Sequence, residues 1–422
     1  MTTKPFTATT LSEATSTSRA RAFQISWGLA MCFYFLEYAA RSAPAVMIPD
    51  LTRALGTTAV GVTAILGTYY YTYSVTSLIA GAALDRVGAK KAVPVGIFVL
   101  ALGCLLFSMP TATLGYAGRL LQGAGSAFAF TGAVYLAVHG FSARWLATAI
   151  GVTQCVGMLG GSAGQFVVGP LLERGLRWQA VWHWLGIASL AVGVLLVLVT
   201  PAETRPKTAG SGWASLLAPY RVVFRNPQSY LCGAVAGLMF VPTTIGDMTW
   251  GVAFFQGDRM FSYHAAVITG SLIPLGWVIG CPLLGWLADR VGRRKPVLIG
   301  GAVAMLLSGA GVTFSTSHTE AAIGCFLFGI ASGAAMIPYT IIKEVNPDEV
   351  KGSATGGINF LTFGVTALIG PVFASAFGKD IAAAQNHAAH FRESGLFWMA
   401  MIAVAILLSA FLRETGHARR TT

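Results

Sequence analysis

The chain has 422 residues, of which 55% are hydrophobic and only 10% charged, and its mean hydropathy is +0.67. Soluble globular domains carry about 25% charged residues, so the composition excludes an ordinary soluble enzyme and predicts an all-α membrane protein. The formal charge of +12 follows from Lys and Arg on one side of the expected spans. That is the positive-inside pattern, which orients helices and indicates no nucleic-acid partner.

Residues 1–21 are rich in Ser and Thr and hold no apolar core of a cleavable signal peptide. We expect them to form a disordered cytoplasmic tail before the first membrane helix. Six cysteines lie in apolar segments without a CxxC pair, so we expect neither disulfides nor a metal site. No cofactor is expected. The cysteines are at positions 32, 104, 155, 232, 281 and 325.

Apolar segments long enough to cross a bilayer recur along the chain. The expected spans are 26–48, 60–80, 92–110, 114–138, 147–169, 180–200, 230–255, 264–284, 296–315, 320–342, 353–377 and 395–412. A polar stretch divides them six and six, which predicts a first bundle at 22–200, a cytoplasmic linker at 201–229, a second bundle at 230–414 and a cytoplasmic tail at 415–422. We expect a monomer in a bacterial inner membrane, with both termini cytoplasmic.

The first span contains the stretch FLEYAARS (35–42), which places Glu37 and Arg41 inside apolar sequence. Charges in a bilayer are costly and usually mark a function or a water-filled cavity. The two residues are spaced i, i+4 with the acid first, so they suit a helical ion pair. That pair alone is one explanation; the other is that Arg41 binds substrate with Tyr34 and Tyr38, which share its face.

A repeat follows the second span, in which Tyr70 and Tyr73 are candidate cavity residues. GAALDRVGAKK (81–91) reappears as GWLADRVGRRK (285–295) between the second and third spans of the other half. The glycines are expected to allow close helix approach and a tight turn, and the charges to lie at helix ends. The shared residues are Gly81, Asp85, Arg86, Val87, Gly88 and Lys91 in the first copy, and Gly285, Asp289, Arg290, Val291, Gly292 and Lys295 in the second.

The fourth span places Arg119, Gln122 and Ser126 on one face. Arg119 could take part in ion coupling or serve a structural hydrogen-bonding role. The fifth span contributes Gln154 as a weaker substrate candidate, and its many glycines (151–170) suit close packing.

The seventh span carries Asp247, the fourth intramembrane charge. Subtracting the repeat offset places Asp247 near the depth of Arg41, so we expect acid and base on opposite walls of one cavity. Either Glu37 or Asp247 could take up a proton during transport. The remaining substrate candidates, each a residue type that also packs in cores, are Trp250, Trp277, Tyr339 and Asn359.

The doubled Gly-x-x-x-Asp-Arg-x-Gly motif and AGRLLQGAGSA (117–127) resemble signatures of the major facilitator superfamily. The resemblance implies two six-helix bundles around a central cavity that opens alternately to each side, with Arg119 linked to coupling. EYAAR (37–41) resembles the first-span motif of anion:cation symporters, with Ala40 in place of an acid, and of organophosphate antiporters. The seventh span lacks the second arginine of phosphate exchangers, which argues against phosphate exchange.

Three functions compete. The first hypothesis is proton-driven symport of a small organic anion, in particular a carboxylate. The second is proton-coupled export of an amphipathic metabolite, drug or siderophore, which the fifth-span glycines favour. The third, a receptor or scaffold, does not need the doubled motif. No nucleotide-binding loop and no hydrolytic Ser/His/Asp arrangement occurs in the sequence, so we expect no enzyme.

Overall fold

The computed structural model describes residues 8–202, 213–257, 259–382 and 388–416, and these contain helices and turns but no strand. The first half is a set of long helices joined by short turns. Its elements are α1 (Ala8–Ser42), η1 (Ala43–Val46), α2 (Ile48–Leu55), α3 (Ala59–Val87), α4 (Ala89–Phe107), α5 (Ala112–Gly140), α6 (Ala143–Phe166), α7 (Val168–Glu173) and α8 (Trp178–Val199).

A linker helix, α9 (Trp213–Arg225), leads into a second half of similar design. Its elements are α10 (Pro227–Val241), η2 (Pro242–Asp247), α11 (Gly251–Gly257), α12 (Tyr263–Val291), α13 (Arg294–Phe314), α14 (His318–Ser332), η3 (Gly333–Met336), α15 (Ile337–Glu344), η4 (Asp348–Val350), α16 (Lys351–Ala382) and α17 (Ala388–Ser409).

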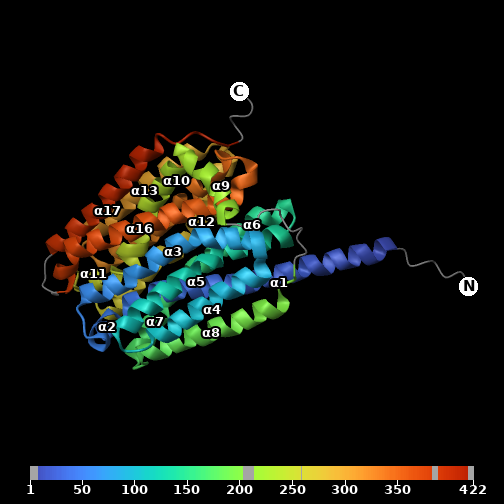
Figure 1. The fold of residues 1–422 in the computed structure, drawn as a ribbon. Helices are drawn as coiled ribbons and strands as arrows, with labels where there is room; N and C mark the ends of the chain where they lie inside the picture. The colour runs from blue at the N-terminus through green and yellow to red at the C-terminus, as the bar shows by residue number, and fades with distance from the viewer. Residues whose placement is uncertain (1–7, 203–212, 258, 383–387, 417–422) are drawn as a thin grey trace, which may run out of the picture.

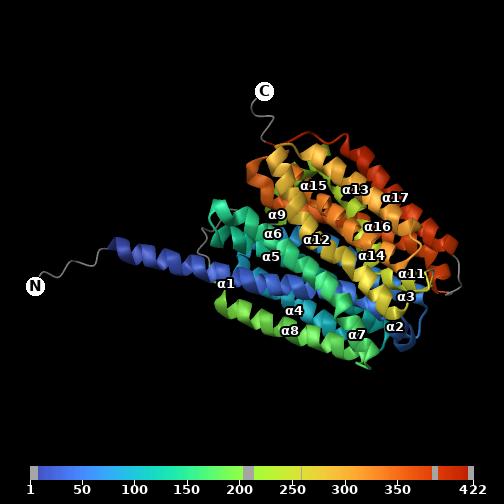
Figure 2. The ribbon, with the colours of Figure 1, turned by 180° about the vertical axis from the view of Figure 1, so that it is seen from behind.

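The two halves lie side by side along their length. In Figure 1 the helices of the first half, blue to green, lie mostly below those of the second half, yellow to red. Contact between the halves runs mainly through α3 against α16 and α6 against α12, and Figure 2 shows α12 running beside α6. This is the expected all-α arrangement of two bundles, and it places any site between them within reach of both.

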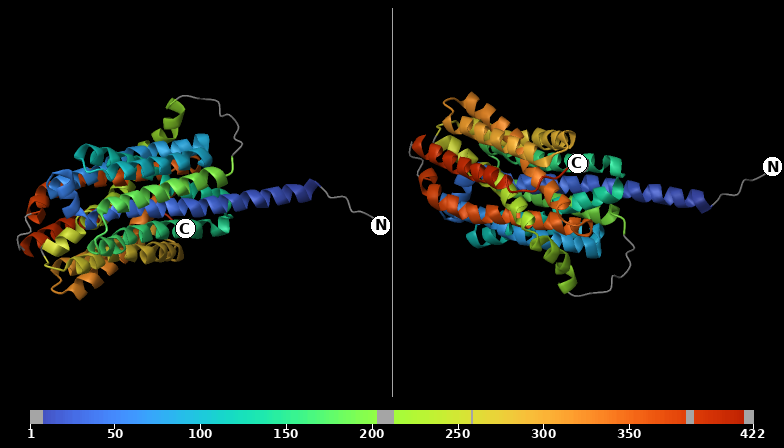
Figure 3. Two further views of the ribbon diagram at one scale, coloured as in Figure 1. Left: turned by 90° about the horizontal axis from the view of Figure 1, so that it is seen from below. Right: turned by 90° about the horizontal axis from the view of Figure 1, so that it is seen from above.

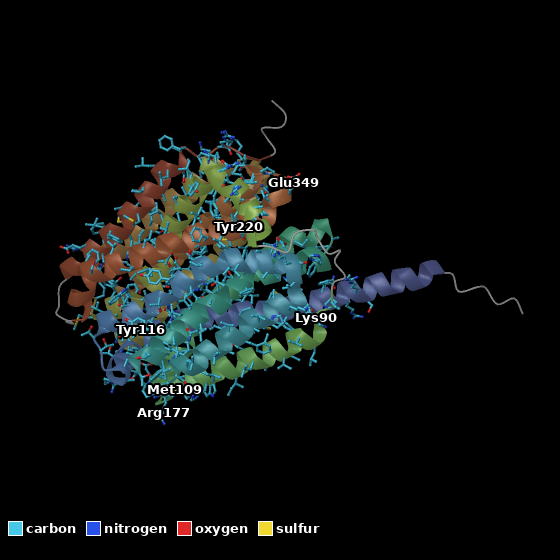
Figure 4. The ribbon with its side chains drawn as sticks, in the orientation of Figure 1. Lys90, Met109, Tyr116, Arg177, Tyr220 and Glu349 are labelled. Carbon is cyan, nitrogen blue, oxygen red and sulfur yellow. The ribbon has the colours of Figure 1, made fainter. Side chains whose placement is uncertain are left out.

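The molecule has two distinct ends. The N-terminal turns of α1 extend well past the other helices, as both views of Figure 3 show. We call this the proximal end; it includes Lys90 and Glu349 (Figure 4). The opposite, distal end includes Met109 and Arg177 (Figure 4).

Ten helices of the described residues are long and apolar enough to cross a membrane by length and composition. The other two expected spans are α1 and α3, which are 35 and 29 residues long. Their hydropathy is lowered by charged residues in α1 and by Tyr, Thr and Ser in α3. A helix that other helices surround needs less apolar surface than one facing lipid, and these two carry the polar groups described below.

The chain departs from the expected elements at several points. Residues 8–21, expected to be disordered, begin α1, because adding residues to an existing helix is far cheaper than starting one. The expected linker contains a helix, α9. The expected first span ends early at Ser42, because Pro44 in the 3₁₀ turn η1 cannot continue the hydrogen bonds of the α-helix. Residues 1–7, 203–212 and 417–422 of the expected tails and linker lie outside the described residues.

The seventh span is broken rather than continuous. The chain passes from α10 into six residues of π-helix, Pro242–Asp247, before α11 resumes at Gly251. Pro242 cannot donate a backbone hydrogen bond to the preceding turn, and π-helical segments are common at functional sites. The break directs the Asp247 carboxylate away from the position that a straight helix would give it.

Close packing against α6 fixes the position of α1. A Cβ on Gly160 would lie 2.2 Å from the Phe35 carbonyl oxygen, so only glycine permits this approach. Another Cβ on Gly164 would lie 2.1 Å from the Ser42 hydroxyl. The fifth-span glycines therefore serve helix packing, which holds the polar face of α1 toward α3 and α5.

Candidate functional site

Glu37 and Arg41 form the expected ion pair on α1, through Arg41 Nη2 and Glu37 Oε1. Both side chains are fully buried. Tyr69 of α3 donates its hydroxyl hydrogen to the same Glu37 oxygen and accepts from Arg41 Nη2 at 3.1 Å. We call Glu37, Arg41 and Tyr69 the charged cluster. Tyr69 was not among the predicted residues.

Aromatic rings surround the Arg41 guanidinium. Its central carbon lies 4.3 Å from the ring centre of Tyr38, 4.9 Å from that of Tyr73 and 5.1 Å from that of Phe363. Cations are attracted to aromatic ring faces at such distances. Phe363 belongs to α16, so residues of both halves hold the cation.

The charged cluster still has unused hydrogen-bonding capacity. Arg41 Nη1 and Glu37 Oε2 are buried and have no partner among the described residues. Leaving such atoms unpaired costs free energy. The unpaired guanidinium nitrogen can therefore donate hydrogen bonds to a further anionic or polar partner.

A central cavity lies between the halves, next to the rings that surround Arg41. Its volume is about 10 Å³, which is barely enough for one water molecule. Its wall consists of aromatic and amide side chains. They are Tyr34, Tyr38, Tyr73, Phe130, Gln154, Phe240, Met336, Tyr339, Asn359 and Phe363.

Two amides face this cavity from opposite halves with their NH₂ groups unpartnered. Tyr34 donates to Gln154 Oε1 at 3.2 Å, and Tyr339 donates to Asn359 Oδ1 at 2.8 Å. Each amide oxygen is thus occupied, while Gln154 Nε2 and Asn359 Nδ2 have no partner among the described residues. The cavity wall offers hydrogen-bond donors, which suit an acceptor-rich ligand.

Six of the ten predicted substrate residues line this cavity, namely Tyr34, Tyr38, Tyr73, Gln154, Tyr339 and Asn359, and Arg41 lies behind them. Tyr70 and Trp250 instead line a separate pocket of about 360 Å³ between α3 and α16. Trp277 packs inside the second half and donates to Thr243 Oγ1 at 3.1 Å. Phe130, Phe240, Met336 and Phe363 were not predicted, because apolar residues in a membrane span carry no distinguishing signal.

Arg119 of α5 connects helices. Its Nη1 donates to the Ala40 carbonyl at 3.1 Å and to Gln122 Oε1 at 2.6 Å. Its guanidinium also lies 4.8 Å from the ring centre of Tyr69. Tyr69 therefore lies between Arg41 and Arg119. These bonds fit the structural role, and the predicted role in coupling stays a prediction.

Asp247 does not share the central cavity with Arg41, so the expectation of opposite walls is wrong. It lines a different cavity of about 90 Å³ inside the second half, among Phe254, Phe328 and Trp398. Neither carboxylate oxygen has a hydrogen-bond partner among the described residues. The number of residues between the two repeats predicts the depth of Asp247 along its helix. It does not predict the direction of the side chain, which changes where the π-helical segment η2 replaces a regular α-helix.

The repeated loops lie at the proximal ends of α3 and α12. Gly88 (φ 77°) and Gly292 (φ 69°) have positive φ, which confirms the expected turns. A Cβ on Gly81 would lie 3.0 Å from the Tyr220 hydroxyl, but no described atom lies within 4 Å of that position on Gly285. The expected close approach thus holds for the first copy and is wrong for the second.

Charges in the second loop are paired within their own half. Arg294 bonds Asp289 at 2.5 Å and Glu344 at 3.0 Å. Lys295 Nζ donates to the Ala410 carbonyl at 2.8 Å, and the Arg290 guanidinium lies over the Trp286 ring. Of the first copy, Asp85, Arg86 and Lys91 lie at the equivalent ends of α3 and α4.

Comparison with known proteins shows what this chain is similar to. The family model described as Major Facilitator Superfamily matches residues 30–371 and 279–422. A "Probable sulfoacetate transporter SauU" of Cupriavidus necator is 24% identical over 91% of this chain and 92% of its own. A "Citrate-proton symporter" of Klebsiella pneumoniae is 23% identical over 82% and 80%.

Among solved structures, a bacterial homolog of the human lysosomal transporter Spinster, crystallised in an inward-facing and unoccupied conformation, matches with a TM-score of 0.71. The match covers 92% of this chain and 97% of that one at 15% identity. At that identity the likeness concerns the fold.

Proposed function

Because the chain belongs to the Major Facilitator Superfamily and is a membrane transporter, we propose that it carries a small organic anion together with a proton. The unpartnered donors around Arg41 are the observation that carries this proposal. Arg41 Nη1, Gln154 Nε2 and Asn359 Nδ2 are all buried and unpaired among the described residues. A cation and two neutral donors around one cavity suit a carboxylate.

The relatives support the same class of substrate. Sulfoacetate and citrate, named in two of them, are both organic acids, and one relative is named a proton symporter. Identities near one quarter do not transfer a substrate, since function depends on the site rather than the fold. The proposal for this chain is therefore the class, a small carboxylate.

Coupling can follow from competition for Arg41. In this structure the Arg41 guanidinium is paired with the Glu37 carboxylate. A proton on Glu37 removes its negative charge and weakens the ion pair, so that a substrate carboxylate can take its place beside Arg41. Loss of the substrate restores the pair only when Glu37 gives up its proton. Binding of the anion and of the proton then favour each other.

Transport requires the halves to separate, because the central cavity holds about 10 Å³. At the level of the cavity, Ser74 of α3 donates to the Phe360 carbonyl of α16 at 2.7 Å. Near the proximal end, a Cβ on Gly352 of α16 would lie 3.7 Å from the Asp85 carboxylate of α3. Toward the distal end, Ser162 of α6 donates to the Ser271 carbonyl of α12 at 3.0 Å. Separating one set of contacts at a time would open the cavity alternately to each side.

A binding experiment tests this proposal. Purified protein is titrated with a panel of organic acids, including citrate and sulfoacetate, while thermal unfolding is followed. We expect at least one carboxylate to raise the unfolding temperature, more strongly at acidic pH. Arg41→Lys should abolish the shift because lysine lacks the fork that binds a carboxylate. The control, Arg53→Ala, removes an exposed arginine on α2 and should keep it.

Export of an amphipathic compound is the alternative outcome. The fifth-span glycines that favoured it pack against α1, for example Gly160 against Phe35. If no carboxylate binds, and hydrophobic cations stabilise Arg41→Lys as well as the wild type, the anion proposal is wrong.

A further inference from the structure

Asp247 and Gln165 are two buried polar residues that face each other across the boundary between the halves. Asp247 ends η2 in the second half, and Gln165 is the penultimate residue of α6 in the first half. Their side chains are 2% and 0% exposed. Both Asp247 oxygens and both polar atoms of Gln165 have no hydrogen-bond partner at bonding geometry among the described residues.

Gly270 of α12 shows how near the two side chains are. A Cβ on Gly270 would lie 2.7 Å from Gln165 Oε1 and 3.0 Å from Asp247 Oδ1. Glycine at this position leaves room for both. The Gln165 amide oxygen and one Asp247 carboxylate oxygen therefore both lie within contact distance of this position. An ionised carboxylate and an amide oxygen both only accept hydrogen bonds, so a hydrogen bond can join these two oxygens only when the carboxyl carries a proton.

We propose that Asp247 and Gln165 form a proton-binding pair that joins the two halves when Asp247 is protonated. The protonated carboxyl donates its hydrogen to Gln165 Oε1, and the Gln165 NH₂ donates to the other carboxyl oxygen. The carboxyl O–H bond forms with a proton taken from solvent and breaks when that proton returns to solvent; no other covalent bond changes. With Asp247 ionised, the amide can offer only its NH₂ group, so one of the two hydrogen bonds is lost.

The surroundings of Asp247 favour the neutral carboxyl over a metal cation. The cavity beside it is lined mainly by apolar and aromatic side chains such as Phe254, Phe328 and Trp398. Sodium or calcium would require several further oxygen ligands. Among the described residues lining this cavity, the Cys325 thiol of α14 is the other titratable group, and none is cationic.

The position of the pair gives it a consequence for movement. Two further bonds join the halves toward the distal end, from the Tyr263 hydroxyl to the Val46 carbonyl at 2.7 Å and from Ser162 to Ser271 at 3.0 Å. Protonation of Asp247 adds a hydrogen bond to Gln165 to these contacts, and deprotonation removes that bond. The pair thus acts as a proton-dependent latch on the distal side of the central cavity.

The latch rests on the proposed proton-coupled transport only for the step of the transport cycle at which it acts. Proton binding by Asp247 can be measured in purified protein without substrate or a gradient. Failure of carboxylate binding at Arg41 and failure of the latch are therefore separate results.

Hydrogen exchange tests the latch. The rate is compared for segments 166–177 and 259–266 at mildly acidic and mildly alkaline pH, in wild type, Asp247→Asn and Gln165→Leu. We expect wild type to exchange about threefold to tenfold faster at alkaline pH than Asp247→Asn at the same pH, the effect of one lost hydrogen bond. Asp247→Asn keeps a donor toward Gln165 and should stay protected, whereas Gln165→Leu should be unprotected at both values.

Infrared difference spectroscopy on the wild type needs no Asp247 variant. Acidification should produce a protonated carboxyl band that shifts in Gln165→Leu. Asp50→Asn, an exposed distal carboxylate on α2, is the matched control and should leave the band in place. A wild-type spectrum without that band, or equal exchange in wild type and Asp247→Asn at every pH, would overturn the proposal.

Discussion

Glu37 and Asp247 are both buried acids in the membrane-spanning part of one chain, yet their surroundings differ completely. Glu37 lies one helical turn from Arg41 on a continuous helix and accepts hydrogen bonds from Arg41 and Tyr69. Asp247 ends a π-helical break and has no cation beside it among the described residues that line its cavity. The difference teaches that burial alone does not define the role of an intramembrane acid; its partner does.

The largest expected effect comes from removing Glu37, the buried acid that is paired with a cation. Glu37→Ala leaves Arg41 charged and buried without its anion, which costs about 3–5 kcal/mol of stability. Thermal unfolding of the purified protein measures it. The double variant Glu37→Ala/Arg41→Leu should be more stable than Glu37→Ala, because no uncompensated charge remains. A double variant less stable than the single one would contradict this, since it would show that Arg41 stabilises the fold even without Glu37.

The next effect concerns the packing that positions Glu37. Gly160→Ala would place a Cβ 2.2 Å from the Phe35 carbonyl oxygen, an atom of the α1 backbone that cannot move alone. We expect a loss of about 1–3 kcal/mol, measured by thermal unfolding. Gly151→Ala is the control on the same helix, where no described atom lies within 4 Å. It should be neutral or stabilising.

A smaller effect is expected at Gly270, the glycine that lies beside Asp247. Gly270→Ala would contact the ends of the Gln165 and Asp247 side chains, which can rotate away. The cost in stability should therefore be below that of Gly160→Ala, on the order of 1 kcal/mol. It should also abolish the pH dependence of distal hydrogen exchange by separating the pair. Unchanged pH dependence in this variant would argue that the two side chains do not act together.

The smallest effect is expected for Asp247→Asn at acidic pH. The asparagine matches the shape of the protonated acid and leaves no ion unpaired, so the unfolding free energy should change by about 0.5 kcal/mol or less. The unfolding free energies of Asp247→Asn and Glu37→Gln are measured under the same conditions and compared, because Glu37→Gln removes a charge that has a partner. A larger loss in Asp247→Asn than in Glu37→Gln would reverse the contrast between the two acids.

Sequence reasoning reached the fold because hydropathy and the doubled loop depend on local pattern. The i, i+4 spacing also predicted the Glu37–Arg41 pair, since both residues lie on one helix. Tyr69 was missed although it lies next to the predicted Tyr70, in the stretch YYYTYS (69–74). The tyrosines of that stretch cover every face of α3, and only tertiary packing selects one.

The second acid shows the limit of such reasoning. Counting residues between the repeats placed Asp247 opposite Arg41, but the π-helical break at Pro242 changes its direction. Gln165 could not be identified, since a single glutamine near a span end has no pattern to distinguish it. Its importance depends on contact between helices α6 and α12, which lie far apart in sequence.

The central claim is that anion and proton bind together through Arg41 and Glu37. Its most direct test measures carboxylate uptake and internal acidification in the same proteoliposomes, with wild type and Glu37→Gln, using an acid found to bind. Wild type should accumulate the acid when protons enter and acidify the lumen in parallel. Glu37→Gln should exchange labelled for unlabelled acid across the membrane but neither accumulate it nor carry protons. Proton-driven accumulation by Glu37→Gln at the wild-type level would contradict the account.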